Sequence, residues 1–272
     1  TVGIAVYVVT RPGAWDGVMY YIKPNFKDFS PTTILAAMGQ LFYSMSLAMG
    51  IMVTYGSYMK KDNHMETSVR QIEIFDTGVA FLAGMMIVPA VYTFMGTEGM
   101  SAGPSLMFVS LPKVFDAMGS IGGIIGIVFF VTVAFAALTS SVSIMEAIVS
   151  SFMDKFHIER KKATLVVALI TAIVGLVVCL GYNVLYFDLT LPNGTVGQVL
   201  DVLDYISNYV LMPIVAIATC ILIGWIMKPS FIIDEIKKSS ASFKREKLYV
   251  VMIKYIAPVM LFVLLLKSFG LF

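Results

Sequence analysis

Charged residues are scarce in this chain of 272 residues. Asp, Glu, Lys and Arg together make up 13% of it, about half the usual share. Hydrophobic residues make up 58%, and the mean hydropathy is +0.88. So few charges cannot provide a water-facing surface for the whole chain. The composition therefore predicts an integral membrane protein whose main partner is the lipid bilayer.

Cysteines, a strong net charge and an N-terminal leader are lacking as well. Cys179 and Cys220 both lie in apolar runs, so we expect small buried residues and no disulfide framework. A net charge of +2 gives no support for a nucleic-acid partner. The chain opens with TVGIAVYVV, without Met or a basic segment. We therefore expect neither a signal peptide nor a natural start, but a fragment of a longer protein.

Long apolar runs dominate what is present. Runs of about 20 residues, enough for a helix to cross a bilayer, occur six times after an apolar stub at residues 1–10. Continuous runs of this length favour helices over the short alternating strands of a barrel, so we expect an all-α membrane protein. The predicted spans are 34–59, 72–95, 120–152, 163–186, 197–227 and 247–271, with outer loops at 11–33 and 98–119.

Lys and Arg are distributed by side of the membrane. The loops 60–71, 153–162 and 228–246 carry most of them, and the intervening loops are poorer in basic residues. By the positive-inside rule these three loops are cytoplasmic. The sequence thus predicts a multi-pass protein of the cell (plasma) membrane with one consistent orientation over all six spans.

Polar and small residues interrupt the first span near its middle, at Gly39, Gln40, Ser44, Ser46 and Gly50. One interpretation is that small residues allow close packing of neighbouring helices. The alternative is a discontinuous helix. Its freed carbonyls would coordinate cations, and the N-terminus of its second half would face an anionic substrate group.

The third span contains a run of hydroxyls, formed by Thr139, Ser140, Ser141 and Ser143 and followed by Glu146. Hydroxyls in membrane helices usually bond back to the preceding turn, which accounts for part of this run. Alternatively, one edge of the helix presents several oxygens, because Thr139 and Ser143 share a face and Ser140 lies beside Thr139. Oxygen is the ligand type that Na⁺ favours.

Acidic residues at the ends of spans also have an ordinary explanation. Asp201 and Asp204 lie three residues apart near the start of the fifth span, and Asp76 lies near the start of the second. Carboxylates are favourable close to a helix N-terminus, so this placement needs no function. Asp154 borders a basic loop, where a solvated charge is expected.

Two long segments carry a family resemblance. GQLFYSMSLAMGIMVTYGSYMKKD and FAALTSSVSIMEAIVSSFMDKF look, in this order, like the neurotransmitter:sodium symporter family of the bacterial type, which has the LeuT fold. RPGAWDGVMYYIKPNFKDFSP resembles the extracellular loop between helices 5 and 6 of that family. The resemblance implies that the six spans are helices 6 to 11 and that residues 1–10 end helix 5. The chain would hold the second inverted repeat, with a discontinuous helix 6, plus helix 11, and would lack the N-terminal helices.

The resemblance also implies site residues, in two sodium sites that residues absent from this chain would complete. The first sodium would bind Ser44 and Asp76, where the family usually has Asn. The second would bind the Ala136 carbonyl and the hydroxyls of Thr139 and Ser140. The implied substrate residues are Tyr43, Ser44, Ser46, Met49, Ser140 and Ile144. The implied gate residues are Gln40, Tyr58, Asp154 and Asp204.

The function implied by the resemblance is sodium-coupled symport of a neutral amino acid by alternating access. Met49 and Ile144 would make the pocket apolar, which favours a hydrophobic or aromatic substrate. Tyr43 stands where the family usually has Phe, so its hydroxyl needs a partner or changes the substrate. The Asp76 carboxylate would supply the negative charge that chloride supplies in other members, which predicts chloride-independent transport.

Two other functions stay open at this point. The protein could be a membrane amino-acid sensor that binds without transporting, or an inactive fragment of a longer symporter. An enzyme is not expected, because His64 and His157 fall in loops and no metal or nucleotide motif occurs. No organic cofactor is expected for the same reason.

Overall fold

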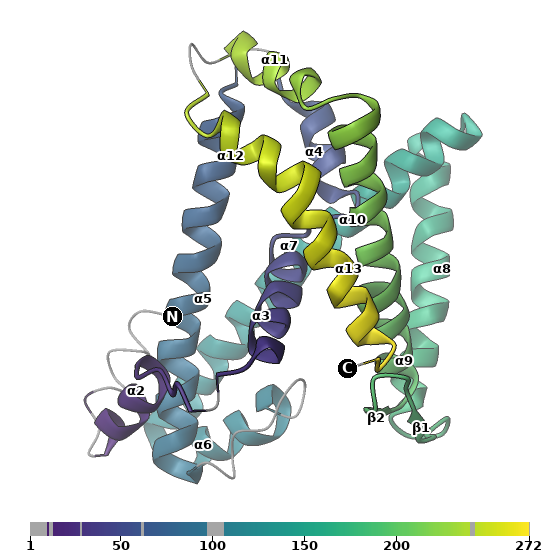
Figure 1. Cartoon of the computed structure of the whole chain (residues 1–272). Coiled ribbons are helices and arrows are strands. Elements are labelled where there is room, and N and C mark those ends of the chain that lie inside the picture. Colours follow the sequence, from purple (N-terminus) through teal and green to yellow (C-terminus); the bar gives the residue numbers. More distant parts are fainter. Residues whose placement is uncertain are drawn as a thin grey trace. The chain divides into compact units, whose positions relative to one another are not determined.

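The computed structural model describes residues 10, 13–27, 29–60, 63–96, 106–239 and 243–271 (Figure 1). Nearly all of the predicted helix 5 stub, and residues 98–105 of the predicted outer hairpin loop, lie outside these ranges. The elements that follow are α2 (Ala14–Ile22), α3 (Pro31–Ser44), α4 (Ile51–Tyr58), α5 (Met65–Met95), η2 (Leu106–Ser110), α6 (Leu111–Ala117), α7 (Ser120–Phe156), α8 (Arg160–Gly181), β1 (Leu189–Thr190), β2 (Val196–Gly197), α9 (Val199–Asp204), η3 (Tyr205–Leu211), α10 (Met212–Ile221), η4 (Leu222–Ile226), α11 (Ser230–Ser239), α12 (Glu246–Val251), η5 (Met252–Ile256) and α13 (Ala257–Ser268).

The helical fold is confirmed, and the first predicted span is divided. Within the described residues, five helices are long and apolar enough to cross a membrane: Met65–Met95, Ser120–Phe156, Arg160–Gly181, Val199–Ile226 and Glu246–Ser268. The apolar run 34–59 is instead split into α3 and α4, so it is a discontinuous helix. In the five spans, 11% to 28% of the most apolar window is buried. Most of their surface therefore faces outward from this chain.

The chain forms two compact units. One consists of Thr1–Phe29 and Ile72–Ser140, and the other of Ser30–Gln71 and Ser141–Phe272. In the first unit, α5, α6 and α7 enclose a core that includes Val91, Val114 and Phe129. In the second, α10 and α13 pack together around Ala216 and Leu261.

Two span-length helices contain π-helical segments just before a proline. Pro213 follows η3 by two residues, and Pro258 follows η5 in the same way. Proline lacks an N–H and crowds the carbonyl four residues earlier. The helix therefore takes the wider π-helical hydrogen-bonding pattern before each proline instead of the regular α-helical one. Pro89, in contrast, lies inside the continuous helix α5, where the Thr93 hydroxyl donates to its carbonyl (2.7 Å).

Some elements were not predicted from the sequence. The loop after α8 holds a short antiparallel hairpin, with Leu189 opposite Gly197. The loop 228–246 contains the helix α11. The two cysteines also differ, because Cys220 is buried as expected but Cys179 is exposed on α8. The expectation of burial for Cys179 was wrong, since α8 presents most of its apolar surface outward in this chain.

Candidate functional site

The helix α3 ends in a motif that usually requires glycine. It begins at a capping box, in which Ser30 N–H donates to the Thr33 hydroxyl (3.4 Å). At its end, Leu47 N–H donates to the Phe42 carbonyl and Ser46 N–H to the Tyr43 carbonyl, both at 3.0 Å. These two bonds define a Schellman motif, and Ser46 has the left-handed conformation of its cap position (φ 53°). The chain therefore stops this helix with a serine in a strained conformation.

The segment between α3 and α4 contains two more left-handed residues. Ala48 has φ 61°, and Gly50, which precedes α4, has φ 79°. Left-handed conformations of non-glycine residues cost about 1–2 kcal/mol each, and persist only where the surroundings impose them. Ala48 packs against the core formed by Ala216, Cys220 and Leu261. This packing fixes the conformation of the segment that separates α3 from α4; the two separate helices are labelled in Figure 1.

The break places opposite ends of two helices near each other in the chain. The C-terminal carbonyls of α3 carry partial negative charge, and the first N–H groups of α4 carry partial positive charge. No side chain of a described residue caps α4 at Gly50. Such an arrangement can bind a cation at one end and a carboxylate at the other.

Four of the predicted substrate residues lie at this break. Tyr43 and Ser44 form the last turn of α3, and Ser46 and Met49 lie between the helices. Tyr43 is 51% exposed in this chain. The discontinuity expected for this span is confirmed, and the packing interpretation applies at Gly39. Gly39 lies within α3 where a Cβ would contact Leu264 of α13 (3.5 Å), which fits close helix packing.

Oxygen atoms also gather on α7. The Thr139 hydroxyl donates to the Ala136 carbonyl at 2.9 Å, so back-bonding occurs at this residue. A donating hydroxyl retains acceptor lone pairs on its oxygen. Two predicted sodium ligands therefore present adjacent oxygens within one unit, on an exposed stretch that also holds Ser140. Ile144 follows one turn later on the same face of the helix.

The position of Asp76 differs from the one expected. The helix α5 begins at Met65 and not near residue 72, so Asp76 lies eleven residues inside it, about 16 Å from its start. The stabilising effect of a helix N-terminus fades within the first turn. The ordinary explanation given above for Asp76 was therefore wrong. Asp76 is half-buried, so its placement needs another explanation.

A polar network centres on Glu146 of α7. This network was not predicted from the sequence. The Tyr58 hydroxyl donates to one of its carboxylate oxygens (2.7 Å), and Arg160 at the start of α8 pairs with the other (2.5 Å). The Glu146 side chain is only 18% exposed. One turn earlier on both helices, the Tyr55 hydroxyl donates to Ser143 (2.5 Å). Two hydrogen bonds, spaced three residues apart on each helix, thus join α4 to α7.

The remaining predicted gate residues are not brought into this network. Asp154 is exposed near the end of α7, and Gln40 is exposed on α3. Asp204 accepts a hydrogen bond from the Asn208 amide (2.5 Å). Asp201 instead forms the capping box of α9 with the Gln198 N–H (2.9 Å), in agreement with its ordinary explanation.

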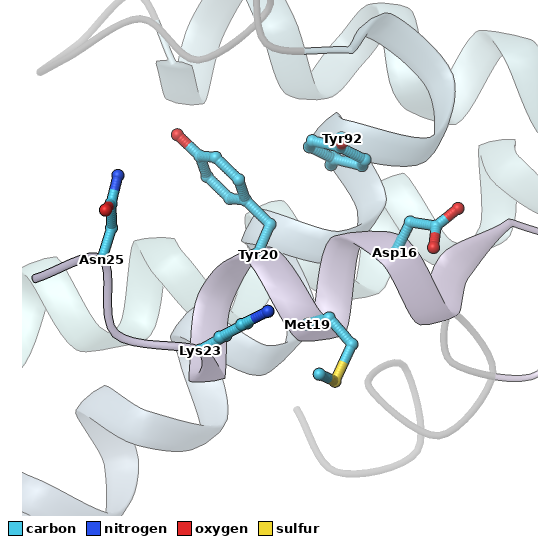
Figure 2. Close-up of a pocket in the computed structure, with 6 residues that line it drawn as sticks. All are labelled: Asp16, Met19, Tyr20, Lys23, Asn25 and Tyr92. Atoms are coloured by element: carbon cyan, nitrogen blue, oxygen red, sulfur yellow. The ribbon is translucent and has the colours of Figure 1, made fainter. Parts of the chain in front are cut away.

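A separate cavity of about 630 Å³ lies in the first unit, at the predicted outer loop. The rings of Tyr20 from α2 and Tyr92 from α5 stack there, with centroids 5.2 Å apart (Figure 2). Asp16 and Lys23 lie toward opposite ends of α2. The residues that line it are Asp16, Met19, Tyr20, Lys23, Asn25 and Tyr92. None of these lining residues is a predicted sodium or substrate residue.

Comparison with known proteins gives one consistent result. Residues 2–272 match the family model described as "Sodium:neurotransmitter symporter family". An uncharacterised sodium-dependent transporter of Haemophilus influenzae is 32% identical over 98% of this chain and 57% of its own length. The uncharacterised sodium-dependent transporter YhdH of Bacillus subtilis is 33% identical over 96% and 57%, respectively. The crystal structure of MhsT in complex with L-phenylalanine matches with a TM-score of 0.85 and 34% identity, over 98% of this chain and 59% of that one. The chain thus spans little more than half the length of these relatives.

Proposed function

Because this chain belongs to the sodium:neurotransmitter symporter family, we propose that its natural polypeptide is a membrane symporter that couples Na⁺ to the transport of a neutral amino acid. The observation that carries the proposal is the break between α3 and α4, where Ser46, Ala48 and Gly50 are all left-handed. A broken membrane helix exposes backbone groups that a continuous helix would satisfy internally. Such groups are suited to an ion and to the charged end of an amino acid.

In this proposal the substrate carboxylate lies near the start of α4, and the first Na⁺ lies near Ser44 and Asp76. The second Na⁺ binds the Ala136 carbonyl with the Thr139 and Ser140 hydroxyls. The Ala136 and Thr139 oxygens lie 2.9 Å apart, close enough for one cation to contact both. Residues outside this chain complete both sites.

The substrate is a hydrophobic or aromatic amino acid. Met49 and Ile144 give the pocket apolar, adaptable walls. The structure of MhsT, which this chain resembles at 34% identity, was determined with L-phenylalanine. Transport is independent of chloride, because the Asp76 carboxylate, deep in α5 and half-buried, supplies the fixed negative charge.

Transport proceeds by alternating access, with the predicted gates opening in turn. Tyr58 and Asp154 act on the side of the basic loops, and Gln40 and Asp204 on the other side. The bond from Tyr58 to Glu146 supports a closed arrangement on the basic side, which Arg160 reinforces. Sodium drives the cycle only if its sites are complete in one conformation and disrupted in the other.

The test uses the natural polypeptide in proteoliposomes with an inward Na⁺ gradient. We expect accumulation of labelled phenylalanine that stops when K⁺ replaces Na⁺ and continues when gluconate replaces Cl⁻. Saturable, Na⁺-dependent binding without accumulation would instead identify a sensor. The absence of both binding and accumulation would contradict the proposal and would indicate an inactive relative of the family.

A further inference from the structure

A lysine lies within the last span-length helix, Glu246–Ser268. Lys254 belongs to the π-helical segment η5, eight residues after the helix begins and about 12 Å along its axis. Ionisable residues inside membrane spans are expensive and usually functional. A lysine side chain at this depth can extend its ammonium group toward the nearer membrane surface. That surface carries the loop 228–246, which the distribution of basic residues predicts to be cytoplasmic.

An aromatic pair lies beside this lysine within the second unit. The Lys254 Nζ lies 6.0 Å from the centroid of the Trp225 ring, which belongs to η4. The Tyr255 ring packs edge-on against Trp225, with centroids 5.9 Å apart and an interplanar angle of 80°. A Cβ at Gly224 would lie 3.2 Å from the Ile253 carbonyl, so glycine permits this close approach of η4 and η5. Two π-helical segments thus build one aromatic and cationic cluster.

No ion pair of Lys254 is found among the described residues. A cation–π contact is attractive but leaves the ammonium charge in place. Glu246, the acid nearest to Lys254 along the chain, pairs with Lys237 at 2.8 Å. A ligand for this cluster should therefore be an anion.

The surface around the cluster is apolar. Leu222, Ile226 and Val259 are 45%, 69% and 63% exposed. A small soluble anion would leave these side chains uncovered, whereas a phospholipid brings acyl chains together with its phosphate. Trp and Tyr also favour the level of the headgroups. We propose that Trp225, Lys254 and Tyr255 bind the phosphate of an anionic phospholipid from the leaflet on the side of loop 228–246.

The test compares lipid retention by native mass spectrometry of the natural polypeptide in detergent. The probes are dioleoyl-phosphatidylglycerol and dioleoyl-phosphatidylcholine, added in equal amounts. We expect the wild-type protein to retain the anionic lipid preferentially. Lys254→Gln should lower this preference about fivefold, as expected for one basic residue near a charged surface. Lys254→Arg should preserve it.

The control is Lys267→Gln, which removes an equal charge at the opposite end of the same helix and should leave the preference near that of the wild type. Equal retention of the two lipids by the wild-type protein would overturn the proposal, and this comparison needs no variant. An effect of Lys267→Gln as large as that of Lys254→Gln would also overturn it, since general charge attraction would then suffice. Neither readout depends on transport.

Discussion

At the scale of single residues, Thr139 gives the sharpest test of the second sodium site. Thr139→Val removes one oxygen at nearly constant volume, so a cation at this site loses a ligand. We expect the Na⁺ concentration that gives half-maximal uptake to rise about tenfold, the effect of losing one interaction with a charged group. The measurement is phenylalanine uptake into proteoliposomes over a series of Na⁺ concentrations.

Thr132 provides the matched control on the same helix. Its hydroxyl donates to the Val128 carbonyl at 2.7 Å, so it too is bonded back to its own helix. Thr132→Val should leave the Na⁺ dependence unchanged. If Thr139→Val behaved like this control, the second sodium site would be wrongly assigned.

Asp76 is expected to determine independence from chloride. Asp76→Asn removes the fixed charge but keeps a similar shape. We expect uptake by this variant to fall in gluconate and to recover in part when chloride is restored, because a mobile anion then replaces the carboxylate. Asp116→Asn, in α6, should show no chloride effect. Equal uptake by Asp76→Asn in both salts would show that Asp76 does not have this role.

Glu146 should stabilise the contact of α4 with α7 and α8. Glu146→Gln weakens the acceptor for Tyr58 and removes the partner of Arg160. We expect the thermal midpoint to fall by about 2–4 °C. Arg160→Gln added to Glu146→Gln should then have little further effect, because both substitutions break the same pair. If the decrease in thermal midpoint of the double variant equals the sum of the decreases of the two single variants, Glu146 and Arg160 are not coupled.

The sequence shows the residue types of the site but not all of their surroundings. The run of hydroxyl side chains on α7 is recognisable in the sequence, because most side chains in a membrane span are apolar. The depth of Asp76 was misjudged because the polar residues 65–71 continue the helix beyond the apolar run. The partners of Glu146 lie 88 and 14 residues away, on elements whose proximity no spacing rule gives.

At the scale of elements, the break between α3 and α4 was predictable in place but not in detail. Glycine and serine in a long apolar run indicate a discontinuity. The conformations of Ser46 and Ala48 are imposed by packing, since neither residue prefers a positive φ. The π-helical segments before Pro213 and Pro258 are a similar case, because proline disturbs the ladder but neighbouring helices decide how it adjusts.

Two glycines of this region should respond oppositely to alanine. A Cβ would meet no atom within 4 Å at either Gly50 or Gly56, so only backbone conformation distinguishes them. Gly50→Ala should destabilise the protein by about 1 kcal/mol, because Gly50 has φ 79°. Gly56→Ala, inside α4, should stabilise it by roughly 0.5–1 kcal/mol. Thermal midpoints of the two variants in one detergent provide the comparison. The same direction of change in both would contradict the left-handed cap.

At the scale of the whole molecule, the helical membrane fold and the family follow from the sequence. Long apolar runs and the distribution of basic residues indicate the membrane fold. Two extended segments of sequence indicate the family. The hairpin β1–β2 and the helix α11 were not predicted, although the sequence carries a signal for each. Asn193-Gly194 favours a hairpin turn, and Ile233 and Ile236, three residues apart, are both buried on one face of α11. The predicted sodium and substrate residues are distributed over both compact units of the chain.

Coupling of ion and substrate is the central claim, and amino-acid-dependent uptake of ²²Na⁺ measures it directly. Proteoliposomes containing the natural polypeptide would be assayed with and without phenylalanine, alongside the Thr139→Val variant. We predict that phenylalanine stimulates ²²Na⁺ entry in the wild-type protein and that the variant loses most of this stimulation at low Na⁺. Phenylalanine uptake without any accompanying ²²Na⁺ entry would contradict the claim.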